Sequence, residues 1–113
     1  MPHLSIEFSK GLEQIYDMQK VCETLFATLA GTSVFDAADI KVRATSAAYF
    51  RIGTEPQTFV HATLLLMEGR DEQTRRGLNT TIIETLRKAL PNVGSITVQD
   101  VELTRATYLK DLA

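Results

Sequence analysis

The sequence predicts an α+β domain in which a four-stranded mixed sheet carries two helices on one face. Four segments have the residue patterns of strands, three by alternation of apolar and polar residues and one by a continuous apolar run, and two segments have the apolar spacing of amphipathic helices. The order strand, helix, strand occurs twice, so residues 2–46 and 59–104 are interpreted as pseudo-repeats of one β-α-β unit. Together they form a single domain over residues 1–113.

The first repeat begins with a strand over residues 3–8. Its apolar side chains alternate with polar ones, which is the pattern of a strand with one buried face. Apolar residues then recur at three- and four-residue spacing over residues 12–29, which predicts an amphipathic helix of about five turns. A second strand follows over residues 40–45, and its alternation places Lys41 and Arg43 together on the polar face.

The second repeat begins with the most apolar segment of the chain, residues 59–67. Both of its faces read as buried, so this strand is predicted to be central or to lie in an interface. Asp71 is a candidate N-cap for the second helix, which Pro91 ends. In the last strand, residues 96–103, the apolar phase changes near residues 99–100, which predicts a bulge or a strand end there.

The two helices leave the second face of this sheet uncovered. Some apolar side chains of residues 59–67 point to that face and need a partner. Exposed apolar patches of this kind mark interfaces, so we expect the chain to form an oligomer.

The composition excludes several functional classes. At 113 residues and 12.6 kDa the chain has the length of one domain. Twelve Lys and Arg against fourteen Asp and Glu give a net charge of −2, which disfavours binding to nucleic acids and to anionic membranes. The longest apolar run is too short to span a bilayer, and no secretory leader opens the chain. With a single cysteine, Cys22, these features predict a cytoplasmic protein.

Familiar catalytic and metal-binding motifs are absent from the sequence. It has no glycine-rich phosphate loop, no serine-hydrolase elbow and no paired cysteines. Cys22 lies in the apolar spacing of the first helix and is interpreted as a buried, inert thiol. His3 and His61 lack a carboxylate at metal-ligand spacing, so we interpret them as structural and predict no metal site.

The N-terminus is the remaining candidate. Pro2 is small enough to favour removal of Met1, which would leave a secondary amine at the head of a strand. Most proteins with proline at this position make no use of it, so Pro2 needs support from the rest of the chain.

That support comes from a resemblance to a known family. The residues that carry it are Met1-Pro2-His3 at the start of a strand, Phe59-Val60-His61-x-Thr63-Leu64 in the apolar strand, and Gly69-Arg70 before the second helix. With the doubled β-α-β order, they resemble the tautomerase superfamily, in particular its 5-carboxymethyl-2-hydroxymuconate isomerase branch. The resemblance runs from Pro2 to Tyr108-x-Lys110, with one modest gap around Gly53.

The resemblance implies a tautomerase-like fold, a homotrimer with the uncovered sheet faces packed around a central axis, and catalysis without a cofactor. It implies that Pro2 is the general base once Met1 is removed. It also implies that Arg70 binds the substrate. Lys41 stands where the family usually has an arginine, and Arg43 matches the second arginine of the same motif.

These residue types suit that chemistry. A base needs a pKa near the working pH, and both partial burial and neighbouring cations lower the pKa of an amine. The same cations can bind a substrate carboxylate and stabilise a dienolate. Lysine at position 41 cannot bind a carboxylate through two parallel hydrogen bonds as arginine does. The identity of the substrate is therefore left open. Simpler, non-catalytic interpretations are also open. Arg70 is then a solvated side chain, and Lys41 and Arg43 are solvent-facing strand residues that pair with Glu7.

We therefore expect an isomerase that moves a double bond in a hydroxymuconate-like unsaturated carboxylate, a chemistry that belongs to the catabolism of aromatic compounds. Its partners are a small-molecule carboxylate and two further copies of the chain, with no nucleic acid and no membrane. Two alternatives stay open: a phenylenolpyruvate-type tautomerase, and a non-catalytic trimeric α+β module that binds a small acidic ligand.

Overall fold

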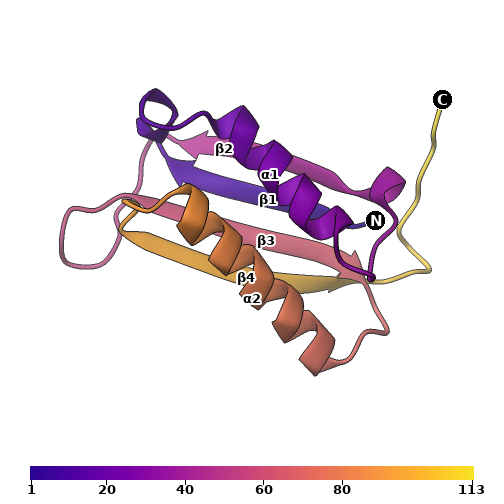
Figure 1. The fold of residues 1–113 in the computed structure, drawn as a ribbon. Coiled ribbons are helices and arrows are strands. Elements are labelled where there is room, and N and C mark those ends of the chain that lie inside the picture. Colours follow the sequence, from indigo (N-terminus) through magenta and orange to yellow (C-terminus); the bar gives the residue numbers. More distant parts are fainter.

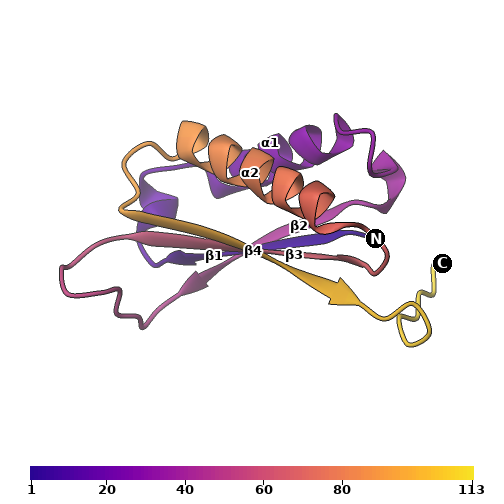
Figure 2. The ribbon, with the colours of Figure 1, turned by 90° about the horizontal axis from the view of Figure 1, so that it is seen from below.

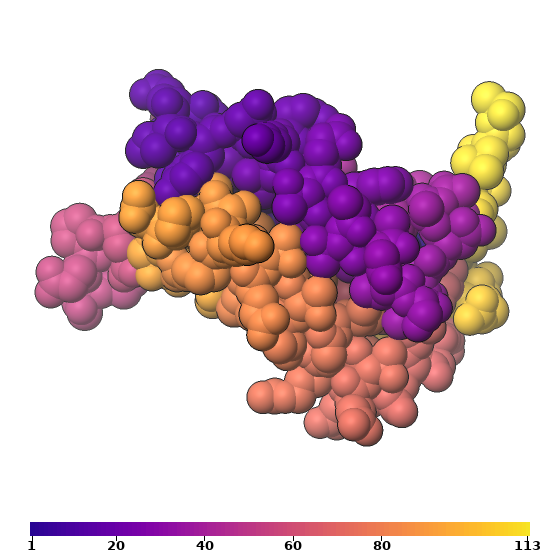
Figure 3. All heavy atoms as spheres, in the orientation of Figure 1, coloured from indigo at the N-terminus to yellow at the C-terminus, as the bar shows by residue number.

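The computed structural model describes residues 1–113 as a four-stranded sheet with both helices on one face (Figures 1 and 2). In the space-filling view, the helices cover the sheet, while the loop after β2 and the C-terminal tail project from the body (Figure 3). The elements are β1 (His3–Ser9), α1 (Met18–Ala30), β2 (Lys41–Ala47), β3 (Phe59–Met67), α2 (Glu72–Ala89) and β4 (Ser95–Leu103), with short 3-10 turns at Leu12–Gln14 and Ala37–Asp39.

The strand order is β2-β1-β3-β4, so β1 and β3 are the central strands. β1 runs parallel to β2, and β3 runs parallel to β4, while the two central strands are antiparallel to each other. This arrangement confirms the predicted α+β class, the mixed sheet and the central position of the most apolar strand. Neither helix is long and apolar enough to cross a membrane.

The hydrophobic core lies between the sheet and the helices. Alternate residues of the central strands point into it, and Leu4 and Leu64 are completely buried there. Each helix contributes one stripe, as its periodicity predicts. The buried residues of the helices are Val21, Leu25 and Leu29 in α1 and Leu78, Ile82 and Leu86 in α2.

The first helix begins later than its apolar spacing predicts. Gly11 has a φ of 108°, which turns the chain sharply after β1, and a separate 3-10 turn follows. α1 itself starts at Met18, where the Asp17 carboxylate accepts a hydrogen bond from the Lys20 amide at 3.1 Å. Ile15 falls within the predicted helix of residues 12–29, but it lies before α1 and is 72% exposed.

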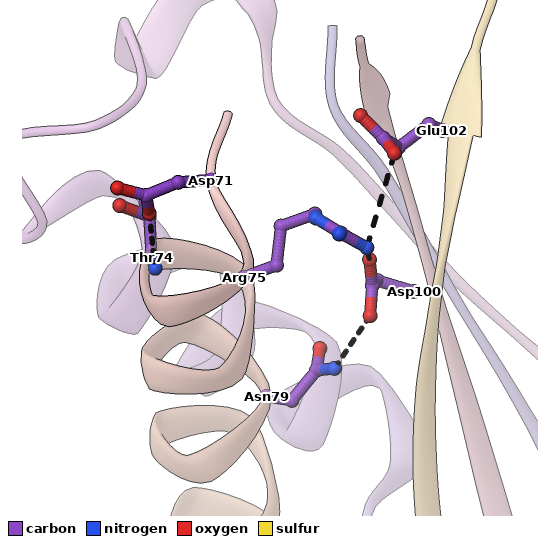
Figure 4. Close-up of polar contacts among 6 residues, drawn as sticks. All are labelled: Asp71, Thr74, Arg75, Asn79, Asp100 and Glu102. Carbon is purple, nitrogen blue, oxygen red and sulfur yellow. Dashed lines mark hydrogen bonds and ion pairs between the residues drawn. The ribbon is translucent and has the colours of Figure 1, made fainter. Parts of the chain in front are cut away.

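The bulge predicted near residues 99–100 does not form. β4 pairs with β3 in one unbroken parallel register, from Phe59 with Ser95 to Met67 with Leu103. The phase changes because Asp100 points to the helix side, where its carboxylate accepts hydrogen bonds from Arg75 and Asn79, each at 2.9 Å (Figure 4).

The sheet face away from the helices has no helix to cover it (Figure 2). Its middle carries a polar network, in which His61 Nδ1 lies 2.6 Å from the Thr97 hydroxyl and Gln99 Nε2 lies 2.9 Å from His61 Nε2. Toward the β3 C-terminus the same face is apolar, and Val101 is 42% exposed there. The members of this apolar patch are Leu65, Met67, Val101 and Leu103.

We expect acid to weaken the fold through Asp100. The hydrogen bond from Arg75 holds the pKa of Asp100 below its usual value, burial opposes this, and the bond from Asn79 adds to the lowering. A carboxyl with a lowered folded pKa stabilises the fold fully above its unfolded pKa, about 3.9, and loses that effect as the pH falls through the folded value. Asp100→Asn should therefore lower the free energy of unfolding by about 1 kcal/mol at pH 7. Below about pH 4 the variant should lose less stability than the wild type does.

Urea denaturation at pH 7 and pH 3 measures both effects. Asp111→Asn is the matched control, because Asp111 lies in the exposed tail and makes no ion pair. Equal acid sensitivity of the wild type and Asp100→Asn would contradict the assignment.

Candidate active site

One end of the sheet collects segments that are distant in sequence. Because β1 is parallel to β2 and antiparallel to β3, His3 lies beside both Lys41 and Leu65. The N-terminus, the start of β2, the end of β3 and the tail after β4 therefore meet at this end (Figure 1). The candidate base and the three candidate cations lie on segments that begin or end here, since Arg70 follows the end of β3.

Pro2 is fully buried at the head of β1. Its carbonyl accepts a hydrogen bond from the Lys41 amide at 3.0 Å, which extends the pairing of β1 and β2 by one residue. With Met1 attached, the Pro2 nitrogen is an amide, and the free amine belongs to Met1. Burial lowers the pKa of that amine, Lys41 and Lys110 lower it further, and Asp39 opposes them.

Lys41 and Arg43 both point to the uncovered face, but they have different partners. The Lys41 ammonium donates to the Asp39 carbonyl at 3.1 Å, beside the N-terminal amine. Arg43 Nη1 donates to His3 Nδ1 at 3.1 Å. Glu7 forms an ion pair with neither cation, so the interpretation of Lys41 and Arg43 as its strand partners is wrong.

Arg70 has different partners from the other two cations. It follows Gly69, whose φ of 110° turns the chain between β3 and α2. Arg70 Nη2 donates to the Val34 carbonyl at 3.3 Å, and the guanidinium carbon lies 5.3 Å from the centre of the Phe35 ring. Its Nε is buried and has no hydrogen-bond partner. Arg70 is therefore held by the loop before β2, and its Nη2 is the only guanidinium nitrogen with an acceptor in the chain.

The structure adds residues that the sequence did not single out. Tyr108 OH lies 2.9 Å from His3 Nε2, and the Lys110 ammonium lies 3.6 Å from an Asp39 carboxylate oxygen. Both tail residues lie in the part of the chain that the resemblance covers, but nothing in their own spacing indicates a role. Only the folded position of the tail places these two side chains near the N-terminus.

The other sequence candidates lie outside this cluster. Cys22 is partly exposed rather than buried, and burial raises the pKa of its thiol, which agrees with an inert side chain. His61 belongs to the polar network in the middle of the open face. No group of three or more His, Cys, Asp or Glu side chains is placed to hold a metal ion.

Comparison with protein families identifies the chain. The family model of 5-carboxymethyl-2-hydroxymuconate isomerase matches residues 2–103. The chain belongs to this family. It is accordingly a member of the tautomerase superfamily, as the residues around Pro2 and Arg70 indicate. No curated protein sequence gives a significant match to it.

Several solved structures share the fold of this chain. A 5-carboxymethyl-2-hydroxymuconate delta-isomerase is 24% identical, with a TM-score of 0.83, over 100% of this chain and 89% of the other. A 5-carboxymethyl-2-hydroxymuconate isomerase from Deinococcus radiodurans R1 is 22% identical, with a TM-score of 0.82, over 97% and 88%. A macrophage migration inhibitory factor-like protein from Entamoeba histolytica is 15% identical, with a TM-score of 0.76, over 97% and 95%.

We expect Lys41 to control the basicity of the N-terminal amine. Lys41→Met removes a neighbouring cation, so the protonated amine becomes easier to form and its pKa should rise. Lys10→Met is the control, because Lys10 lies at the opposite end of β1. The pH dependence of amine labelling measures both variants. If the amine pKa shifts equally in the two variants, or does not shift in Lys41→Met, then Lys41 does not control the basicity of the amine.

Proposed function

We propose that this family member is a cofactor-independent isomerase that moves a double bond in a small unsaturated carboxylate of the 5-carboxymethyl-2-hydroxymuconate type. The observation that carries the proposal is the placement of the N-terminus. The chain presents its amine at the head of a central strand, partly buried and beside Lys41, in surroundings that lower the amine pKa. Family membership points to the same chemistry.

Pro2 acts as the general base once Met1 is removed. Its secondary amine takes a proton from the enol hydroxyl or from a carbon of the substrate, and the electron pair left behind spreads over the conjugated system as a dienolate. The amine then returns the proton to a different carbon, so the double bond moves and no atom is gained or lost. Burial of Pro2 disfavours the protonated form of this amine, which suits a general base.

The three cations have different roles in binding and catalysis. Arg70 binds a substrate carboxylate, which is supported by its Nη1 group, because that group is not buried and has no acceptor within the chain. Lys41 and Arg43 stabilise the dienolate charge and lower the amine pKa. Lys41 contributes charge without the fork of an arginine, so a substrate with fewer carboxylates, as in a phenylenolpyruvate-type tautomerase, is the second candidate. The chemistry belongs to cytoplasmic catabolism of aromatic compounds.

The active form is proposed to be a homotrimer with the uncovered sheet faces turned inward. The apolar patch of Leu65, Met67, Val101 and Leu103 supports this, because it lies on the face that the helices do not cover.

Light scattering should therefore give three times the chain mass of 12.6 kDa. Val101→Glu should lower that mass by placing a charge in the interface, whereas Leu112→Glu, in the exposed tail, should not. A wild-type monomer at micromolar concentration would refute the assembly.

Replacing Pro2 tests the base directly. In protein shown by mass analysis to lack Met1, Pro2→Ala should lower turnover of an enol substrate by roughly two to four decades, the usual worth of a positioned base. Full activity in the variant would make Pro2 structural. Retained Met1 together with no turnover in the wild type would support the non-catalytic trimeric module that binds a small acidic ligand.

Steady-state kinetics should separate the roles of the cations. Arg70→Ala should raise KM about tenfold with little change in kcat, because it removes binding felt equally in the ground and transition states. Lys41→Ala should chiefly lower kcat, because it removes stabilisation of the developing charge. Arg76→Ala, an exposed arginine of α2, is the control. Unchanged kinetics in both site variants would refute these roles.

A further inference from the structure

Three side chains from three parts of the chain form a hydrogen-bonded series beside the N-terminus. Arg43 of β2 contacts His3 of β1 through Nδ1 at 3.1 Å, and His3 contacts Tyr108 of the tail through Nε2 at 2.9 Å. The His3 and Tyr108 rings meet edge to face, with centroids 6.0 Å apart.

The direction of each hydrogen bond in this series follows from elementary chemistry. A guanidinium can only donate, so Arg43 donates to His3 Nδ1, which must carry the lone pair. Neutral His3 then carries its hydrogen on Nε2 and donates it to the Tyr108 oxygen. The hydroxyl hydrogen of Tyr108 is consequently left over, because its oxygen is already the acceptor. A hydroxyl that accepts one hydrogen bond is a stronger donor in the next.

The surroundings keep His3 neutral, as the series requires. Burial lowers the pKa of His3 first, followed by Arg43, Lys41 and the N-terminal amine. Lys41 acts on both His3 and the N-terminal amine, and the amine itself acts on His3, so His3, and with it Tyr108, belongs to the same site as the candidate base. Lys110, two residues beyond Tyr108, lowers the pKa of the amine itself.

The charge of this site selects the ligand that Tyr108 can meet. The cations that act on the amine or on His3 are Lys41, Arg43 and Lys110, and Asp39 is the one carboxylate that acts on either. A ligand that enters here is an anion, and the unused hydroxyl hydrogen requires an acceptor. Carboxylate and enolate oxygens satisfy both conditions.

We propose that Tyr108 is a further substrate-binding residue, whose hydroxyl donates to an anionic oxygen of the substrate while His3, held by Arg43, positions it. The inference deepens the proposed function and uses the same site. It also explains why the tail is fastened at both sides of Tyr108, by the Glu68 carboxylate to the Arg105 amide and by Asp39 to Lys110. These two contacts would hold the tail in place without the hydroxyl.

The first measurement concerns the series itself. Nitrogen-15 NMR of the imidazole at neutral pH should show His3 with its hydrogen on Nε2, and Arg43→Met should lose this preference. A hydrogen on Nδ1 in the wild type would overturn the proposal, because Tyr108 would then have to donate to His3.

The second measurement concerns binding, in protein without Met1 and with muconate as an unreactive dicarboxylate probe. Tyr108→Phe keeps the ring and should weaken muconate binding about tenfold, the effect of one hydrogen bond to a charged group. Tyr49→Phe is the matched control, because Tyr49 is 96% exposed and should bind as the wild type does.

Variants of His3 separate positioning from folding. His3→Gln retains a side-chain N–H donor and should keep most of the affinity, whereas His3→Leu should lose as much as Tyr108→Phe. The double variant with His3→Leu and Tyr108→Phe should lose no more than either single variant, because both remove the same interaction.

Each outcome decides the proposal. If Tyr108→Phe binds muconate with wild-type affinity, Tyr108 only holds the tail in place. If the losses of affinity add in the double variant, His3 does not position Tyr108. No binding of muconate to the wild type would overturn the Tyr108 site. Tyr108-dependent muconate binding in a protein that turns over no enol substrate would instead refute the isomerase and leave the Tyr108 site standing.

Discussion

The position of β1 between β2 and β3 is the constraint on which the rest of the structure depends. Its two registers put His3 beside both Lys41 and Leu65, and the bond from the Lys41 amide to the Pro2 carbonyl extends the ladder to the N-terminus. A slip of one residue would exchange every buried side chain of β1 for a polar one. Leu4 and the other core residues of β1 therefore hold the register that assembles the site.

Packing and chemistry are coupled through Pro2. The residue is buried because the chain enters the sheet at this point, and the same burial makes a positive charge on the adjacent amine costly. Lys41 and Lys110 add to that cost from two directions, one from β2 and one from the tail. A weakly basic amine surrounded by cations suits both proton transfer and the binding of anions, so the features that lower the pKa also attract the substrate.

The alternation of side chains along β4 gives the two faces of the sheet different roles. On the helix side, β4 places Asp100 beneath α2, where Arg75 and Asn79 satisfy it (Figure 4). The neighbouring Val101 is thereby turned to the uncovered face, next to Leu103. A partly buried polar contact within one chain thus leaves an apolar patch available for contact with another chain, which links the stability of the monomer to the proposed assembly.

The order of elements, the common side of the helices and the shared face of Lys41 and Arg43 could all be predicted from the sequence. Alternation and helical spacing report local burial, and local burial is what fixes these features. The true start of α1 could not be predicted, because it depends on the turn at Gly11 and the cap at Asp17 rather than on apolar spacing. The continuity of β4 depends on partners of Asp100 that lie in another element. Only the tertiary structure brings Tyr108 to His3, across 105 positions of sequence, because contact between such distant residues depends on the path of the folded chain and leaves no periodicity in the residues themselves.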